Sequence, residues 1–300
     1  MKKGTTILTL DNGYHLWTNT QGEGDIHLLA LHGGPGGTHE YWEDTAKQLA
    51  QRGLNVQVHM YDQLGSFYSD QPDFSDPKNA SILTYDYYID EVEEVRKKLG
   101  LDNFYLIGQS WGGALVQLYG LKYGKHLKGA IISSMIDNTE EYVAAVNARR
   151  AEVLNPDELA YMKKIEDEKN WDDPKYQKYV DKLNDQFVDR RETPAISHLI
   201  DTMATDVYGA FQGDNEFVVT GKLKEFDLRG KLKDLSMPTY LVFSDHETMP
   251  VDVAKRMEKD IPRSRLSITP DSGHHGMTDN PKHYYDHLAQ FITDVENNKF

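Results

Sequence analysis

Short apolar runs recur along the chain, and most are separated by segments in which apolar residues return every three or four positions. Runs of this length are typical of buried strands, and the longer spacing is typical of amphipathic helices. Strands that alternate with helices predict a mainly parallel sheet. We expect its strands at residues 26–31, 56–60, 104–107, 130–134, 239–243 and 266–268.

The beginning of the chain departs from this alternation. Residues 5–10 and 14–18 flank the turn sequence Asp11-Asn12-Gly13, which is typical of a β-hairpin. The clearest helix is expected at 85–99, where apolar residues share one face. Its acidic run at 90–94 indicates that the opposite face is in contact with water.

A long segment in the second half of the chain interrupts the pattern. From 136 to about 225 the chain is highly charged, rich in tyrosine and helical in character. We therefore predict an α/β fold whose core is formed by residues 1–135 and 231–300, with a helical cap at 136–230. An insert between two strands of one parallel sheet is expected above the carboxyl ends of the strands.

Composition limits the partners and the chemistry. The 33 basic and 48 acidic residues give a formal net charge of −15. This charge repels nucleic acid and anionic membrane surfaces, so we expect neither as a partner, and it favours a small, cationic substrate. The chain has no cysteine, which excludes disulfides, a thiolate nucleophile and cysteine-ligated metals.

The sequence contains no pattern that indicates export or membrane insertion. The apolar run near the start is interrupted at Asp11-Asn12-Gly13, before the core of a signal peptide can develop. No stretch approaches the roughly 18 consecutive apolar residues of a membrane-spanning helix. We expect a soluble, cytoplasmic protein.

A serine follows the apolar run at 104–107 in a tight glycine-flanked turn. The segment Gly108-Gln109-Ser110-Trp111-Gly112 lies between an expected strand and an expected helix, which is the setting of a nucleophile elbow. Side chains at Gly108 and Gly112 would clash in so tight a turn, and Ser110 would be held in a strained, exposed conformation. The pattern predicts Ser110 as a nucleophile.

A glycine-rich loop follows the strand at 26–31. Its sequence is His32-Gly33-Gly34-Pro35-Gly36-Gly37, and it lacks the Gly-Lys-Ser/Thr ending of a phosphate loop. In hydrolases with a nucleophile elbow, such a loop and the amide after the nucleophile bind the oxyanion of the reaction. We predict the amides of Gly34 and Trp111 as the two donors.

The remaining partners of such a serine are expected after the last two strands, in the chain order serine, acid, histidine. His274 follows the small-residue turn at 271–273, and we choose it over His275 as the base. The acid is expected after the preceding strand, where both Asp245 and Glu247 could orient the imidazole. These residues alone leave both carboxylates open.

Two further histidines could suggest a metal site. His283 and His287 are four positions apart on an expected helix, but no third acidic ligand is evident nearby. We interpret them as surface or packing residues and expect neither a metal nor a cofactor.

Four motifs distributed over nearly the whole chain occur together: residues 32–36 (His-Gly-Gly-Pro-Gly), 61–66 (Tyr-Asp-Gln-Leu-Gly-Ser), 108–113 (Gly-Gln-Ser-Trp-Gly-Gly) and 213–217 (Gly-Asp-Asn-Glu-Phe). Together they resemble the proline iminopeptidase group of α/β hydrolases. The resemblance implies an α/β-hydrolase fold, with a mainly parallel eight-stranded sheet, helices on both faces and a helical cap.

The resemblance also implies roles for two glutamates. A gapless match to the family's Gly-x-x-Asp turn places Glu247 at the acid position, with Asp245 as the competitor because the family normally has aspartate there. Glu216 occupies the position of the family's cap glutamate that binds the substrate's free α-amino group. A second amine-binding glutamate of the family is replaced here by Thr248.

These features predict a serine peptidase that releases an N-terminal residue, proline foremost, from short peptides through an acyl-enzyme. Prolyl aminopeptidase and prolinase-type dipeptidase activities both fit, and so does an amino-acid amidase. The substrate is expected to be a short peptide or amino-acid amide with a free N-terminus. An esterase, or a ligand-binding protein that kept the fold but lost turnover, is the alternative.

Overall fold

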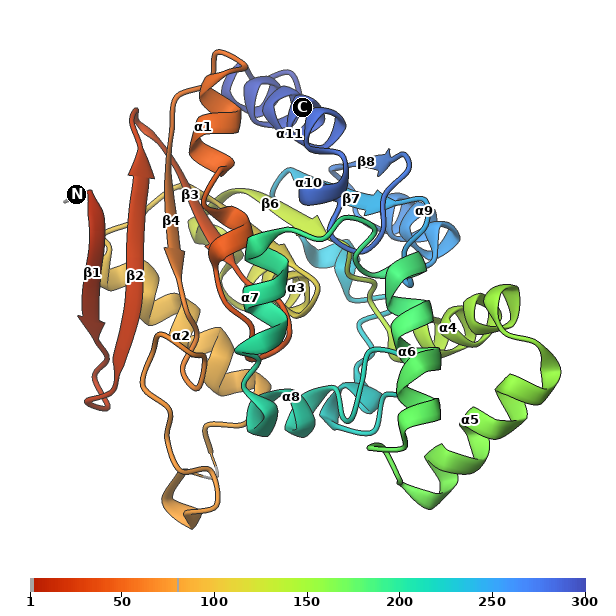
Figure 1. The fold of residues 1–300 in the computed structure, drawn as a ribbon. Coiled ribbons are helices and arrows are strands. Elements are labelled where there is room, and N and C mark those ends of the chain that lie inside the picture. Colours follow the sequence, from red (N-terminus) through yellow and green to blue (C-terminus); the bar gives the residue numbers. More distant parts are fainter. Residues whose placement is uncertain (1–2, 80) are drawn as a thin grey trace.

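An eight-stranded sheet forms the centre of the molecule in the computed structural model, which describes residues 3–79 and 81–300 (Figure 1). The strand order is β1-β2-β4-β3-β5-β6-β7-β8. β2 is antiparallel to both β1 and β4, and all pairs from β4 to β8 are parallel. The strands are β1 Gly4–Thr9, β2 His15–Gly22, β3 Ile26–Leu31, β4 Val56–Tyr61, β5 Phe104–Gln109, β6 Leu127–Ser133, β7 Thr239–Ser244 and β8 Ser264–Thr269.

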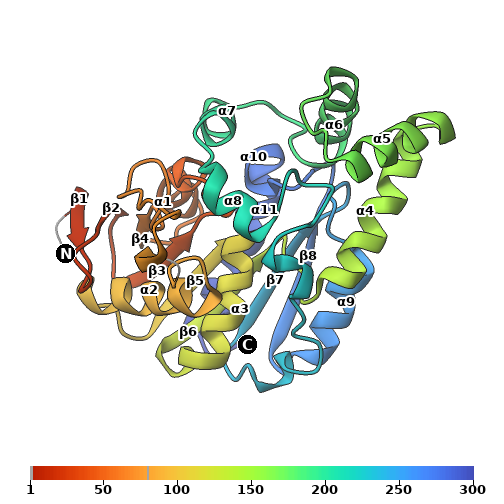
Figure 2. The ribbon, with the colours of Figure 1, turned by 90° about the horizontal axis from the view of Figure 1, so that it is seen from below.

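Helices cover both faces of this sheet. The helices are α1 Thr45–Ala50, α2 Tyr85–Lys98, α3 Trp111–Tyr123, α4 Thr139–Val153, α5 Pro156–Glu168, α6 Pro174–Phe187, α7 Pro194–Asp201, α8 Thr205–Phe211, α9 Val251–Asp260, α10 Gly276–Asp279 and α11 Pro281–Glu296. α2, α3 and α9 pack on one face, and α1 and α11 pack on the other (Figure 2). The predicted α/β class, the parallel sheet and the N-terminal hairpin are therefore confirmed.

The continuous apolar character of the central strands follows from this two-sided burial. In β3, Leu28 and Ala30 belong to the hydrophobic cluster that includes α1 and α11, whereas Leu29 and Leu31 belong to the cluster that includes α2 and α3. Successive side chains of a strand point to opposite faces, so a strand covered on both sides needs apolar residues at every position.

The acidic run of α2 differs from its predicted solvent-exposed position. Glu91 is only 3% exposed and accepts a hydrogen bond from the amide of Leu64, and burial raises its pKa to about 8. Glu93 is also buried, where it pairs with Arg96 and accepts a hydrogen bond from the Tyr119 hydroxyl. The prediction was wrong for these two residues because α2 is covered by α3 and by the segment after β4 as well as by the sheet.

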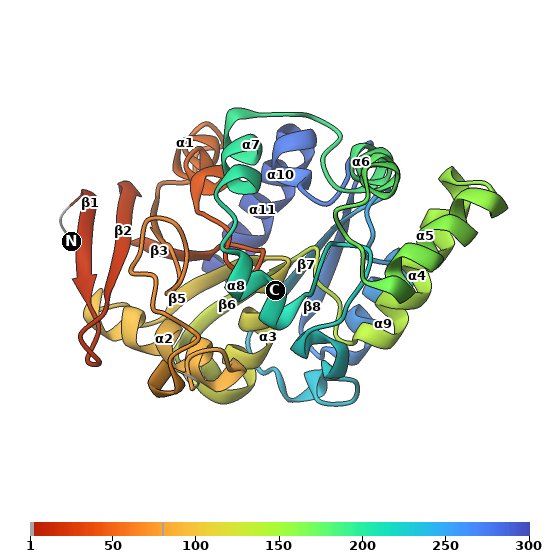
Figure 3. The same ribbon diagram turned by 60° about the horizontal axis from the view of Figure 1, so that its bottom comes forward.

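Five helices, α4 to α8, separate β6 from β7 along the chain. They form a group outside the sheet, in which α5 lies furthest from the strands (Figure 3). Side chains of α6, α7 and α8 face the loops at the carboxyl ends of β3, β5 and β8 across a cavity. This is the edge of a parallel sheet at which ligands of α/β proteins bind.

No helix within residues 3–79 and 81–300 combines the length and the apolar character that crossing a membrane would require.

Candidate active site

Ser110 lies in a sharp turn between β5 and α3. Its backbone has a φ of +54° and a ψ of −120°, a region that residues with side chains rarely adopt. A Cβ atom at Gly108 would collide with the backbone of Gly112, and one at Gly112 would collide with the carbonyl oxygen of Leu31. Only glycine fits at both positions, and the turn directs Ser110 toward the cavity, as its sequence pattern predicts.

His274 and Glu247 meet beside this turn, although 27 positions separate them. Nδ1 of His274 lies 3.0 Å from Oε2 of Glu247, and both side chains are buried. The other carboxylate oxygen of Glu247 accepts hydrogen bonds from the Ser244 amide at 2.6 Å and from the Ser134 hydroxyl at 3.1 Å. These bonds hold the carboxylate against one ring nitrogen of the histidine.

Asp245, the competing carboxylate, has a different set of partners. Its two oxygens accept hydrogen bonds from the amides of Asp271 and Ser272, at 3.0 and 3.2 Å. Asp245 therefore braces the loop that carries His274 and makes no hydrogen bond to the imidazole.

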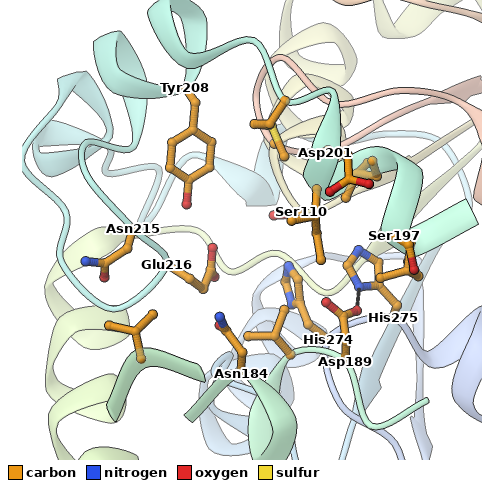
Figure 4. A pocket seen from close by; sticks show the side chains of 18 of the residues that line it. Ser110, Asn184, Asp189, Ser197, Asp201, Tyr208, Asn215, Glu216, His274 and His275 are labelled. Atoms are coloured by element: carbon orange, nitrogen blue, oxygen red, sulfur yellow. Dashed lines mark hydrogen bonds and ion pairs between the residues drawn. The ribbon is translucent and has the colours of Figure 1, made fainter. Parts of the chain in front are cut away.

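The neighbouring histidine is also paired with an acid. Nδ1 of His275 lies 2.6 Å from Oδ1 of Asp189, which follows α6 (Figure 4). Burial lowers the pKa of His275, but the carboxylate of Asp189, together with those of Asp279 and Glu216, outweighs burial and the net pKa is raised. The sequence pattern did not identify Asp189, because it belongs to the segment between β6 and β7 and carries no local motif.

Burial decides the charge of His274. It lowers the pKa of His274 to about 4, so the imidazole is neutral near pH 7 and able to accept a proton. Nε2 is buried and has no hydrogen-bond partner among the described residues. Burial also raises the pKa of Glu247, and the hydrogen bonds from Ser244 and Ser134 oppose that rise.

Two backbone amides near Ser110 are free to donate. Among the described residues, the amides of Gly34 and Trp111 have no hydrogen-bond acceptor. Trp111 is the first residue of α3, where the helix dipole favours negative charge. Gly34 has a φ of +109°, and a side chain there would meet the amides of Gly36 and Gly37.

Two cavities meet at Ser110. The large cavity has a volume of about 600 Å³ and is lined by Ser110, His274 and residues of α6 to α8 (Figure 4). The small cavity is mainly apolar, with Trp111, Met135, Ile136, Tyr142, Leu223 and Met249 among its lining residues. Gly34, Ser110 and Glu216 line both cavities, so the serine lies at their junction.

Glu216 is held at this junction by the chain between α8 and β7. Its Oε1 accepts a hydrogen bond of 2.7 Å from the hydroxyl of Tyr142, which comes from α4. No sequence pattern distinguishes Tyr142 from the many other tyrosines in this segment. Thr248 is buried and lines neither cavity, so it does not replace the missing second glutamate of the family.

The other candidate histidines lie elsewhere. His283 and His287 stack with ring centroids 4.1 Å apart at the beginning of α11, and Nδ1 of His287 bonds the carbonyl oxygen of His283. Within the part of the chain that the structure describes, no three potential ligand side chains converge as a metal site.

Comparison with known proteins assigns this chain to a family. Residues 26–281 match the family model described as "alpha/beta hydrolase fold". A proline iminopeptidase from Flavobacterium johnsoniae is 32% identical, over 91% of this chain and 92% of its own. One from Elizabethkingia meningoseptica is 34% identical, over 98% of this chain and 99% of its own. The chain belongs to the proline iminopeptidase family of α/β hydrolases.

A solved structure agrees with this family assignment at the level of the fold. The crystal structure of proline iminopeptidase from Mycobacterium smegmatis superposes with a TM-score of 0.84 and 22% identity, covering 99% of this chain and 100% of that one. The resemblance inferred from the four sequence motifs is confirmed, and the protein is a hydrolase of the aminopeptidase class.

Proposed function

We propose that this member of the proline iminopeptidase family releases N-terminal proline from short peptides through an acyl-enzyme on Ser110. The observation that carries the proposal is the position of Ser110 at the junction of the two cavities, beside a carboxylate, Glu216, that lines both. A substrate whose carbonyl lies at Ser110 can place its N-terminal residue on one side and its leaving part on the other.

In the proposed acylation, Oγ of Ser110 attacks the carbonyl carbon and its proton passes to Nε2 of His274. Nε2 is suited to this step because His274 lines the same cavity as Ser110 and Nε2 has no hydrogen-bond partner among the described residues. The C–N bond then breaks, and the proton on Nε2 passes to the leaving amine. Water repeats the two steps on the ester, which frees the acid and restores Ser110.

Two other groups support these transfers. Glu247 holds His274 in the tautomer with the proton on Nδ1 and stabilises the imidazolium that forms. The unengaged amides of Gly34 and Trp111 donate to the oxygen that becomes negative during the attack. Such donors act without reorganisation because the backbone already fixes their positions.

We assign the N-terminal residue to the small cavity, whose free volume is only about 20 Å³, so a proline ring requires its walls to move apart when the substrate binds. Its walls are mainly apolar, which suits a proline ring, and Glu216 at its edge supplies a carboxylate for the α-amino group. A comparison of proline anilide with N-acetylproline anilide tests the proposal. We expect only the free amine to be hydrolysed at an appreciable rate, and equal turnover of the two substrates would refute the aminopeptidase assignment.

Replacing Glu216 with glutamine should weaken recognition of the amine. A hydrogen bond to a charged group contributes about 1.5–3 kcal/mol, so we expect kcat/KM for proline anilide to fall by about 10- to 100-fold. Glu168→Gln, an exposed change at the end of α5, is the matched control and should retain activity. If kcat/KM is unchanged in Glu216→Gln, another group of the protein binds the α-amino group of the substrate.

The pH profile should report the buried histidine. Because burial lowers the pKa of His274 to about 4, the base stays neutral above that pH and gains a proton only below it. We expect kcat/KM to hold below the ordinary histidine range and to fall as the pH drops through about 4. Steady-state rates, with circular dichroism to exclude acid unfolding, measure this limb. If the activity instead falls around the ordinary pKa of histidine, the assignment is contradicted. If the limb near pH 4 is still present in Glu216→Gln, Glu216 is excluded as the group that titrates.

A further inference from the structure

The large cavity is lined by acidic side chains. Among the described residues, six carboxylates without an ionic partner surround it, and neither lysine nor arginine lines it. The six are Asp181, Asp185, Glu192, Asp201, Asp214 and Glu216. A seventh carboxylate, Asp189, is paired with His275. Five of the six are exposed and Glu216 is half-buried, so the cavity carries net negative charge that paired cations of the protein do not cancel but that dissolved salt screens.

Helix stability does not explain two of these carboxylates. Asp201 is the last residue of α7, and Asp185 lies in the last turn of α6. The C-terminal end of a helix carries partial negative charge, so an acidic residue there is destabilising. Asp185 and Asp201 therefore place negative charge at the cavity although they lower the stability of the helices that carry them.

The reacting groups open onto this same cavity. His274 is 3% exposed and lines the cavity together with Ser110, and its buried Nε2 has no hydrogen-bond partner among the described residues. Glu216 lies on one side of Ser110 and Asp201 on the other (Figure 4). If the N-terminal residue occupies the small apolar cavity, the part of the peptide beyond the scissile bond extends into the acidic one.

We propose that the acidic cavity selects the leaving part of the peptide by charge. It favours a cationic second residue, and it disfavours acidic residues and dipeptides whose free C-terminal carboxylate lies next to the scissile bond. The inference rests on the proposed aminopeptidase function. Of the activities that the sequence leaves open, the charge selection favours an aminopeptidase that acts on longer or amidated peptides. It disfavours a prolinase-type dipeptidase, whose substrates carry a free carboxylate next to the scissile bond.

A matched substrate series tests the selection. Prolyl-lysine amide, prolyl-norleucine amide and prolyl-glutamate amide differ mainly in charge at the second residue, and released proline measures their cleavage. We expect kcat/KM to decrease in that order by about tenfold per step. Prolyl-norleucine with a free carboxylate should be cleaved more slowly than its amide. The differences should shrink as the Debye length falls from about 30 Å at 0.01 M salt to about 3 Å at 1 M.

Variants then assign the effect to the cavity. In the double variant Asp185→Asn/Asp201→Asn, the preference for lysine over norleucine should fall toward one. Because the two changes remove negative charge from helix C-terminal ends, we expect this variant to fold, and its thermal unfolding temperature measures this. Asp234→Asn, in the turn before β7 at the opposite edge of the sheet, changes the net charge in the same direction and should keep the preference.

The outcomes separate the two proposals. If none of the four substrates releases proline, the proposed function fails and the inference fails with it. If all are cleaved at rates independent of charge, only the charge selection fails. A preference that survives in Asp185→Asn/Asp201→Asn at low salt would also overturn the assignment to these carboxylates.

Discussion

Ser110→Ala should lose essentially all turnover of proline anilide, by a factor of about 10⁴ to 10⁶ in kcat. The hydroxyl is the atom that would form the acyl-enzyme, and the neighbouring groups act through it, so nothing nearby can replace it. The change removes one oxygen atom from a residue whose strained backbone the flanking glycines accommodate. We therefore expect the variant to fold.

Covalent labelling measures the same prediction independently of any substrate. A fluorophosphonate should label the native chain and leave Ser110→Ala unlabelled. Ser197→Ala is the matched control, because Ser197 also lines the large cavity (Figure 4). Labelling that persists in Ser110→Ala, or that disappears in Ser197→Ala, would place the nucleophile elsewhere. Absence of labelling in the native chain would favour a ligand-binding protein over an enzyme.

Glu247→Ala should reduce kcat by about 10⁴-fold, far more than Asp245→Ala. Glu247 holds His274 Nδ1 at 3.0 Å, and its loss frees the ring to rotate and to exchange tautomers. Asp245 caps the amides of Asp271 and Ser272 instead. Its replacement should destabilise the histidine loop and lower the thermal unfolding temperature, with a smaller effect on chemistry.

Glu247→Gln separates orientation from charge. The amide is close to the carboxylate in size, but it cannot stabilise an imidazolium and favours the wrong tautomer, so kcat should fall nearly as far as in Glu247→Ala. Steady-state kcat and thermal unfolding of all three variants provide the comparison. Greater loss of kcat in Asp245→Ala than in Glu247→Ala would show that the acid is Asp245.

The expected strands correspond closely to the observed ones because their signal is local. The run at 26–31 coincides with β3, and the helix expected at 85–99 corresponds to α2 Tyr85–Lys98. In each case, the apolar pattern reflects which neighbouring surfaces cover the element. The same reasoning was wrong for Glu91 and Glu93, since periodicity does not reveal a second covering element such as α3.

The nucleophile turn could be predicted for a similar reason. The turn at Ser110 spans five residues whose Gly-x-Ser-x-Gly pattern can be read in the sequence, and Gly108 is needed by the backbone of that turn, whereas Gly112 is needed by the approach of Leu31 from β3. By contrast, the pairing of Tyr142 with Glu216 joins α4 to a segment that follows α8. Long-range pairs of this kind leave no pattern in a single sequence.

The sequence by itself determined the parallel sheet, the turn at Ser110 and the glycine-rich loop at Gly34, because each leaves a pattern in residues near in the chain: strands that alternate with helices, a Gly-x-Ser-x-Gly segment and a run of glycines. Only the tertiary structure decided which carboxylate faces His274, since Asp245 and Glu247 differ in direction and not in chemistry. It also decided that six scattered carboxylates surround one cavity at Ser110. Their common placement arises from the packing of α6, α7 and the segment after α8 over the strand ends, which no local pattern encodes.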